Sequence, residues 1–291
     1  MRMLPLIPLL LALALGWSSH TQAAEAAPRA ILKLEPYANI LSVRASVNGH
    51  AGRFLLDTGG GLTVLSPGFA GKAGCKPWGR LVGHTMMANR IDMQRCDGLS
   101  FDLAGLAVKK ATVGILDLGP MLGPGAEPVD GLIALDLFAE QAITFDAGAG
   151  QLIVESPASL RARTARAQEL PVRFTREMQG LTLSASVELR VADGPLYFEI
   201  DTGNGGVAVL VAKPYAALFG LDPEAKGGQH LSRRIAPGID IETDAALAPD
   251  IILDGNLGLP VLRNWIVTLD LHGGRLWLSP GSSAPRAGTA K

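Results

Sequence analysis

The chain has 291 residues, of which 48% are hydrophobic and 18% are charged, and its formal net charge is −1. This length and composition suffice to bury the core of one large domain or two smaller ones, and 35 glycines and 19 prolines favour a turn-rich β fold. No block of like charge is present, so the sequence gives no support for a nucleic-acid partner.

The first 26 residues have the plan of a secretory signal peptide. Arg2 supplies a positive start, residues 4–16 are an apolar run of 13 residues, and small residues follow at the candidate cleavage sites 21–23 and 24–26. A run of this length is short for a membrane span, which needs about 20 residues. We therefore expect an exported chain, periplasmic or secreted and of Gram-negative type, with no stable membrane span once residues 1–26 are removed.

Two segments of equal length, residues 43–57 and 187–201, share one plan. Each begins with alternating apolar and polar residues, turns at Asn48-Gly49 or Asp193-Gly194, and then runs apolar into an Asp-Thr-Gly triplet. Alternation on either side of an Asn-Gly or Asp-Gly pair indicates a β-hairpin. We therefore expect each triplet to follow the second strand of a hairpin.

Further blocks match in the same order after each triplet. A short helix is expected at residues 67–74 and again at residues 214–220. An Asp-Gly-apolar segment follows at residues 130–138 and 254–262, and a strand-turn-strand unit begins at Ile143 and at Val267. Matching blocks in one order indicate an internal repeat. Because 73 residues separate Asp57 from Asp130 but only 53 separate Asp201 from Asp254, the first half carries 20 extra residues.

The repeat suggests how the chain divides. We expect a first lobe over residues 30–155, a linker over residues 156–171, and a second lobe over residues 172–279. The linker is polar and rich in Arg and Ala, and it breaks the strand pattern. Residues 280–291 are rich in Gly, Ser, Pro and Ala, and we expect a disordered tail there.

The only two cysteines, Cys75 and Cys96, lie in the extra stretch of the first half. In an oxidising compartment an even count favours one disulfide, although two small buried side chains that never meet would also fit the sequence. The spacing of the pair is not that of a metal site, and no histidine cluster could complete one.

The two triplets, Asp57-Thr58-Gly59 and Asp201-Thr202-Gly203, are the residues best suited to chemistry. One Asp-Thr-Gly alone is also an ordinary turn sequence, but two copies in matching contexts are a much stronger signal. Two carboxyl groups held a few Å apart share one proton, so one can act as a general base on water while the other polarises a carbonyl group. Glycine lets the backbone turn and present N–H groups, and threonine can bond across to the other half.

These residues resemble the aspartic peptidase clan of pepsin and the retroviral proteases, and most closely its bacterial retropepsin-like members. The matching stretches are residues 55–60 and 199–204, and the family's second landmark, two apolar residues before a glycine, falls on residues 132–134 and 256–258. Over about residues 35–279, the resemblance implies an all-β fold (mostly β with short helices) of two pseudo-symmetric, retropepsin-like β-barrel lobes with a cleft between them.

The resemblance also implies an activity: an aspartic endopeptidase without a cofactor or metal, which acts on a peptide or protein in the inter-lobe cleft. The site residues that it implies are Asp57 and Asp201 as the catalytic pair, with Thr58, Gly59, Thr202 and Gly203 as supports. The two halves in one chain make pairing with a second chain unnecessary, so we expect a monomer.

Three residues depart from the family pattern. Gly60 and Asn204 stand where Ala or Ser is usual, and Ala134 replaces the glycine of the second landmark. Asn204 places a larger polar side chain near the pair, and Ala134 could shift the loop behind Asp57. Both leave room for a second hypothesis, a non-catalytic periplasmic module that binds peptides or proteins on the same fold.

The family closes its cleft with a β-hairpin flap, and residues 79–95 could form one with its tip near residues 85–89. The candidate flap residues are His84, Thr85, Met86 and Met87. An ordinary surface hairpin is the alternative. The second half has less room for a flap, so we expect a single one, whose base a disulfide between Cys75 and Cys96 would tie to the helix after Asp57.

Overall fold

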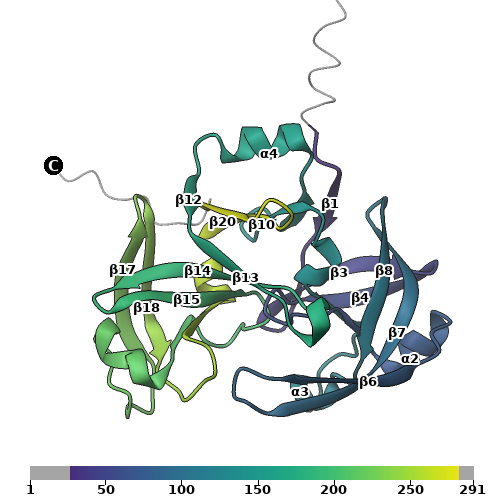
Figure 1. Cartoon of the computed structure of the whole chain (residues 1–291), viewed down its shortest axis with the longest axis horizontal. Coiled ribbons are helices and arrows are strands. Elements are labelled where there is room, and N and C mark those ends of the chain that lie inside the picture. The colour runs from purple at the N-terminus through teal and green to yellow at the C-terminus, as the bar shows by residue number, and fades with distance from the viewer. Residues whose placement is uncertain (1–26, 282–291) are drawn as a thin grey trace, which may run out of the picture.

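The computed structural model describes residues 27–281, with the side chains of residues 110 and 111 left aside (Figure 1). The expected signal peptide and residues 282–291 of the expected tail lie outside the described residues. Within the described part of the chain, no helix is long and apolar enough to cross a membrane.

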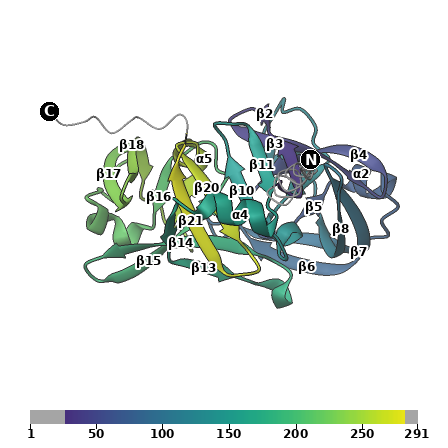
Figure 2. The same cartoon turned by 90° about the horizontal axis from the view of Figure 1, so that it is seen from above.

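Three β-sheets make up most of the fold, which is all-β with short helices as expected (Figures 1 and 2). The first is an eight-stranded sheet in the order β2 (Glu35–Tyr37), β3 (Ile40–Val47), β4 (His50–Leu56), β9 (Gly131–Ile133), β5 (Val64–Leu65), β8 (Leu106–Ile115), β7 (Arg90–Leu103) and β6 (Trp78–His84). We call this sheet, with α2 (Pro67–Lys72), α3 (Gly119–Leu122) and η1 (Leu135–Phe138), the first lobe.

The second lobe is a seven-stranded sheet. Its order is β13 (Val172–Thr175), β14 (Ser184–Val191), β15 (Gly194–Asp201), β19 (Gly255–Gly258), β16 (Val209–Val211), β18 (Ile239–Leu247) and β17 (Gln229–Ala236). The short helices η2 (Met178–Gly180), η3 (Lys213–Phe219) and α5 (Leu259–Leu262) belong to it. The two lobes lie side by side in Figure 1, the second on the left and the first on the right.

A six-stranded sheet joins the two lobes above the space between them (Figure 1). Its order is β1 (Ala30–Lys33), β11 (Gln151–Val154), β10 (Ala142–Asp146), β20 (Trp265–Asp270), β21 (Arg275–Pro280) and β12 (Gln168–Leu170). β10 and β20 are antiparallel neighbours at its centre, and the hydroxyls of Thr144 and Thr268 lie 3.0 Å apart there. This sheet therefore fixes one lobe against the other.

The segment expected as a linker has a regular structure of its own. α4 (Pro157–Thr164) begins with a capping box, in which Ser156 and Ser159 exchange side-chain and backbone hydrogen bonds. β12 then joins the edge of the shared sheet through β21. The polar residues of this segment are thus used in a helix that lies across the top of the molecule (Figure 1).

The two hairpins that precede the triplets form as expected, with one difference in the turn. Between β3 and β4 the turn is Asn48-Gly49, and both residues have positive φ (49° and 82°), as a two-residue hairpin turn requires. Between β14 and β15 the turn is Ala192-Asp193, one residue earlier than the expected Asp-Gly pair, and Gly194 opens β15.

Each lobe has an aromatic pair beneath its hairpin. In the first lobe, Phe54 on β4 packs edge-on against Phe69 on α2, with ring centroids 5.3 Å apart. In the second lobe, Phe198 on β15 packs against Phe219 on η3 at the same distance. These pairs anchor the short helices that follow each triplet, which holds the second strand of each hairpin against its core.

Candidate active site

The two aspartates end corresponding strands. Asp57 follows β4 directly, and its N–H donates to the carbonyl of Ile133 (3.0 Å) on the parallel neighbour β9. Asp201 is the last residue of β15, where it lies opposite Gly258 on the parallel neighbour β19. A buried strand on each side therefore fixes the backbone from which each carboxyl group projects.

Thr58 and Thr202 cross-link the two loops by matching hydrogen bonds. The N–H of Thr58 donates to Thr202 Oγ1 (3.1 Å), and the N–H of Thr202 donates to Thr58 Oγ1 (3.0 Å). The hydroxyl of Thr58 donates to the carbonyl of Ile200 (2.6 Å), and that of Thr202 donates to the carbonyl of Leu56 (2.8 Å). Because every buried donor has a partner in the opposite lobe, the loops are held together as one unit.

Gly59 and Gly203 are needed for space. A Cβ atom at Gly59 would lie 2.6 Å from Cγ of Asp201, and one at Gly203 would lie 2.5 Å from Cγ of Asp57. Neither distance is tolerable, so each carboxyl group fits against the bare glycine of the other triplet. The structure brings all six residues of the two triplets together.

The carboxyl groups of Asp57 and Asp201 are hydrogen-bonded to each other. Burial, and then the charge of Asp201, raise the pKa of Asp57 to about 8, against the opposing amides of Gly60 and Gly59. Burial also raises the pKa of Asp201, but Asn256 and two backbone amides oppose it. The pair thus holds one shared proton well above the usual pH for a carboxyl group.

Asp201 receives more hydrogen-bond donors than an ordinary strand-end aspartate. Its Oδ1 accepts from the N–H groups of Gly203 (2.8 Å) and Asn204 (3.1 Å), and its Oδ2 accepts from Nδ2 of Asn256 (2.8 Å). Donors of this kind favour the ionised form. Asp57 also accepts two backbone N–H groups, from Gly59 and Gly60, but Leu132 stands in its lobe at the place of Asn256. The extra donor therefore favours the ionised form of Asp201 over that of Asp57.

The unusual residues Asn204 and Ala134 leave the pair intact. The Asn204 side chain donates from Nδ2 to Asn256 (2.9 Å) and accepts the N–H of Val207 (3.1 Å), so it braces the loop. Ala134 is buried, and its N–H donates to Thr63 Oγ1 (3.2 Å). Beside this alanine, Asp57 keeps its backbone bond to Ile133 on β9.

Two polar residues beside the pair were not predicted from the sequence: Asn256 and Glu199. Asn256 stands in the second landmark, where the first lobe has Leu132, and Glu199 stands two residues before Asp201, where the first lobe has Leu55. A polar residue in one copy opposite an apolar residue in the other was the signal that could have found them. Their positions reveal an asymmetry between the two aspartates.

The hairpin expected over residues 79–95 is present as β6 and the first half of β7, with its turn at residues 85–89. Thr85 closes the turn, since its carbonyl and hydroxyl accept the N–H groups of Ala88 (2.9 Å) and Asn89 (3.2 Å). His84 and Met87 are exposed there.

Met86 joins the tip of this hairpin to the second lobe. Its carbonyl accepts the N–H of Ile252 (3.0 Å), and its side chain packs beside the buried residues Leu210, Ala212 and Ile251. The hairpin therefore bridges the two lobes, as Figure 1 shows at the bottom of the molecule.

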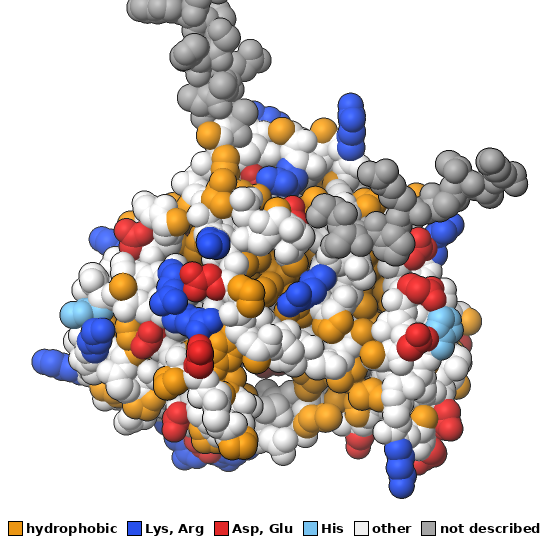
Figure 3. All heavy atoms as spheres, turned by 180° about the vertical axis from the view of Figure 1, so that it is seen from behind, with side chains coloured by type: hydrophobic (Ala, Val, Ile, Leu, Met, Phe, Trp, Pro, Cys, Tyr) orange, Lys and Arg blue, Asp and Glu red, His pale blue; other side chains and the backbone are white. Residues whose placement is uncertain are grey.

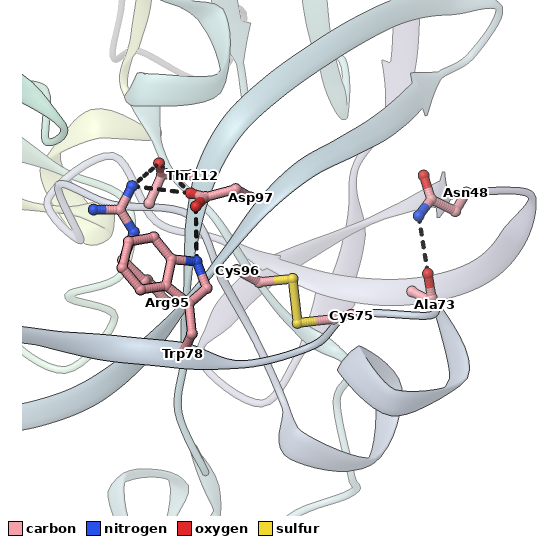
Figure 4. The surroundings of a disulfide bond; sticks show 8 residues. All are labelled: Asn48, Ala73, Cys75, Trp78, Arg95, Cys96, Asp97 and Thr112. Carbon is pink, nitrogen blue, oxygen red and sulfur yellow. Dashed lines mark hydrogen bonds and ion pairs between the residues drawn. A yellow bond between two sulfur atoms is a disulfide. The ribbon is translucent and has the colours of Figure 1, made fainter.

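Cys75 and Cys96 form a disulfide, so the alternative of two separate thiols is excluded (Figure 4). Their Cα atoms are 6.0 Å apart, and the bond links the chain just after α2 to β7 at the base of the hairpin. Closing a loop of this length stabilises a fold by about 3 kcal/mol on the chain-entropy account. The expected connection between the hairpin and the helix after Asp57 is therefore present.

A cavity of about 640 Å³ lies between the lobes beside the Asp201 loop. Residues 203–206 line it from the second lobe, and residues 36–40, Arg53, residues 121–122 and 125–127 line it from the first. The surface is also visibly hollowed between the lobes on the face shown in Figure 3. Across residues 27–281, no group of three or more His, Cys, Asp or Glu side chains is arranged to hold a metal ion.

Comparison with known families and structures agrees with this geometry. Residues 43–137 match the profile of the aspartyl protease family. No curated protein matches the chain. The match covers the first lobe from its leading hairpin to the strand and turn behind Asp57, which are the elements that position this aspartate.

Similar solved structures cover nearly the whole chain. The aspartic proteinase of Irpex lacteus has a TM-score of 0.52 and 14% identity, over 87% of this chain and 97% of its own. Soybean basic 7S globulin (TM-score 0.54, 10% identity) covers 86% of this chain and 94% of its own. Conglutin gamma, a basic 7S globulin from lupine seeds, has a TM-score of 0.56 and 10% identity, over 88% of this chain and 96% of its own. At these identities the likeness shows a shared fold. The first lobe thus matches the aspartyl protease family, and the chain as a whole has the two-lobed β fold of these structures.

Proposed function

We propose that this protein is an aspartic endopeptidase in which Asp57 and Asp201 activate a water molecule against a peptide bond. The observation that carries the proposal is the pair of carboxyl groups bonded to each other between two cross-linked Asp-Thr-Gly loops. A buried pair that shares one proton supplies an acid and a base side by side, which is what hydrolysis by bound water needs.

The donors around the pair support a division of roles. Asp201, held as the carboxylate, takes a proton from the attacking water, while the proton on Asp57 passes to the carbonyl oxygen of the scissile bond. The new C–O bond gives a tetrahedral intermediate with two hydroxyl groups. The C–N bond then breaks as Asp201 gives its proton to the leaving nitrogen and a hydroxyl of the intermediate returns a proton to Asp57. The water is consumed and the pair regains its single proton, so no cofactor takes part in the sequence.

We further propose that the substrate is an extended peptide or protein segment bound between the lobes by a monomeric chain. The cavity beside residues 203–206 supports this by offering space next to the Asp201 loop. The hairpin that reaches from β6 and β7 to the second lobe could add strand-like hydrogen bonds to such a segment. An exported, periplasmic or secreted location fits the expected signal peptide and the disulfide between Cys75 and Cys96.

A second candidate function is a non-catalytic module that binds peptides or proteins. Two observations favour it: two of the three similar structures are described as globulins, and Met86 already bonds the hairpin to the second lobe. The intact pair of aspartates favours the peptidase.

Hydrolysis of a mixed peptide library between pH 3 and pH 8 would separate the two. We expect the wild-type chain to cleave, and Asp57→Asn and Asp201→Asn each to lose activity by at least about 10³-fold, because each removes one partner of a unit. Cleavage that survives both substitutions would refute the assignment of the pair. Peptide binding without cleavage at any pH would favour the binding module.

A further inference from the structure

A third carboxyl group is buried beside the two aspartates, and the mechanism above does not use it. Glu199 lies two residues before Asp201 on β15, so both side chains project from the same face of the strand. Glu199 is buried, with only 8% of its surface exposed. Charged groups are rarely buried without a specific partner, which makes this position unusual.

Asn256 connects Glu199 to Asp201. In the parallel register of β15 and β19, Asn256 lies opposite Glu199, and it is fully buried. Its Nδ2 donates to Oδ2 of Asp201 (2.8 Å) and also lies 3.4 Å from Oε2 of Glu199. An amide nitrogen has two hydrogens, so it can serve both carboxyl groups at once.

The orientation of the Asn256 amide is fixed from both ends. Its Oδ1 accepts from Nδ2 of Asn204 (2.9 Å), while its Nδ2 faces the two carboxyl groups. If the Asn256 amide were reversed, its oxygen would face the oxygens of Glu199 and Asp201, and its nitrogen would face the side-chain nitrogen of Asn204. Glu199 and Asn204 therefore both keep the donor of Asn256 on Asp201.

The fold itself does not require this polar chain. In the first lobe, the same parallel register places Leu55 opposite Leu132. Leu132 also lies beside the loop, since a Cβ atom at Gly60 would come within 3.2 Å of its Cδ1. Two leucines thus satisfy in one lobe the packing that Glu199 and Asn256 satisfy in the other.

The surroundings of Glu199 favour its neutral form. Burial raises its pKa well above the usual range, and the charges of Asp201, Asp57 and Glu177 raise it further. The groups that face it are these three carboxyl groups and the amide of Asn256, which alone lowers its pKa. Glu199 therefore offers an oxygen acceptor without adding a charge next to the pair.

We propose that Glu199 is a positioning residue: it holds the Asn256 amide with its nitrogen on Asp201, and so makes the aspartate of the second lobe the base of the pair. This inference rests on the proposed peptidase function and adds the reason for its asymmetry. Glu199 touches neither water nor peptide in this role and acts only through Asn256.

Two substitutions at this position test the proposal through activity. Glu199→Gln keeps a neutral acceptor of the same shape, so we expect kcat and the pH profile of wild type. Glu199→Leu copies Leu55 of the first lobe and leaves Asn256 unanchored, so kcat should fall about ten- to hundred-fold. The acidic limb of the kcat/KM profile should also move to higher pH, because Asp201 loses a donor to its ionised form.

Three further measurements keep the result interpretable. Asn256→Leu, which copies Leu132, should reproduce both effects of Glu199→Leu. Glu155→Gln alters a buried carboxyl of the shared sheet, which accepts from Thr144 (2.7 Å) and Arg163 (2.7 Å), and should leave the pH profile unchanged. Thermal unfolding of each variant shows whether it is folded.

A ¹³C NMR titration of labelled aspartate carboxyl groups separates this proposal from the proposed function. If wild type hydrolyses nothing, the peptidase proposal fails, yet the titration midpoint of Asp201 should still rise in Glu199→Leu and stay in place in Glu199→Gln. The positioning role would be overturned if the folded Glu199→Leu variant titrates like wild type. It would also be overturned if Glu199→Gln loses as much activity as Glu199→Leu, since that would assign the effect to a charge.

Discussion

Polar side chains support the loops of Asp57 and Asp201 in different ways: one stops short of the aspartate, and the other bonds to it. In the first lobe, Asp136 Oδ1 accepts the N–H (2.9 Å) and the hydroxyl (2.6 Å) of Thr63, so the support ends at the turn behind the aspartate. In the second lobe, Asn256 reaches the Asp201 carboxylate itself. The two backbones match, but their side chains do not, and the roles proposed above for the two aspartates rest on this difference.

The lobes also differ in how they cover each other. The second lobe sends residues 176–183 over the first triplet loop, where the N–H of Leu183 donates to Gly61 (2.8 Å), and Met178 of this segment contacts Gly83 on β6. The first lobe has only the tight turn between β2 and β3 at the corresponding place, and the cavity lies there. One flank of the site is therefore filled and the other is open.

Among the changes that would disturb the match between the two lobes, we expect the largest loss of activity from Gly203, which packs against the Asp57 carboxyl group. Gly203→Ala places a methyl group 2.5 Å from the Asp57 carboxyl, so we expect peptide hydrolysis to fall about 10²-fold or more as the pair is forced apart. Gly68→Ala in α2 is the matched control, since no atom lies within 4 Å of its Cβ and the residue is outside the site. Equal activity in both variants would contradict the close fit.

The disulfide sharpens the difference between the lobes, because both of its cysteines belong to the first. Cys75→Ser with Cys96→Ser should lower the free energy of unfolding by about 3 kcal/mol in urea titrations. Hydrogen exchange should show the loss of protection in β6, β7 and β8, with β17 and β18 unaffected. Dithiothreitol serves as the control, since it should destabilise wild type and leave the double variant unchanged.

The pH dependence of stability tests whether the pair of aspartates holds a proton above the usual pH for a carboxyl group. The pKa of Asp57 is raised from 3.8 to about 8, so its contribution to stability is complete below pH 3.8 and is lost as the pH rises through 8. We expect the free energy of unfolding of wild type to fall between pH 4 and pH 8 relative to that of Asp57→Asn. A constant difference between the two chains across this range would show that the pair does not retain a proton there.

The smallest effect concerns the hairpin tip. Met86→Ser removes a side chain that packs in the second lobe, so the N–H of Ile252, which donates to residue 86, should exchange a few-fold faster by NMR. Met87→Ser is the control, because Met87 is 50% exposed and its loss should leave this exchange rate unchanged. The same exchange rate in both variants would mean that the tip is not held by Met86.

The sequence was sufficient for features that depend on local pattern. The alternation around Asn48-Gly49 predicted a hairpin, and the two triplets predicted loops. The extra residues of the first half predicted the hairpin of residues 79–95, and the structure has each of these elements. The turn at Ala192-Asp193 escaped, since an Asp-Gly pair can fill more than one pair of turn positions.

The features that were missed depend on topology. Asn256 follows Glu199 by 57 residues and meets it only because β15 and β19 pair in parallel in one register. No local pattern states which residue lies opposite which across a sheet, so this partnership had to be read from the fold. The same holds for α4 and β12: their polar residues fit a linker as well as a capped helix and an edge strand.

The sheet shared by the lobes has a consequence for any attempt to divide the chain. β10 pairs with β20 along five residues, from Ala142 opposite Asp270 to Asp146 opposite Ile266. A fragment ending after β11 would expose the open edge of β10, and a fragment beginning at β12 would expose the open edge of β20. Such edges are templates for a new strand, so co-expressed halves should recognise each other by strand pairing and rebuild a complete molecule from two polypeptides.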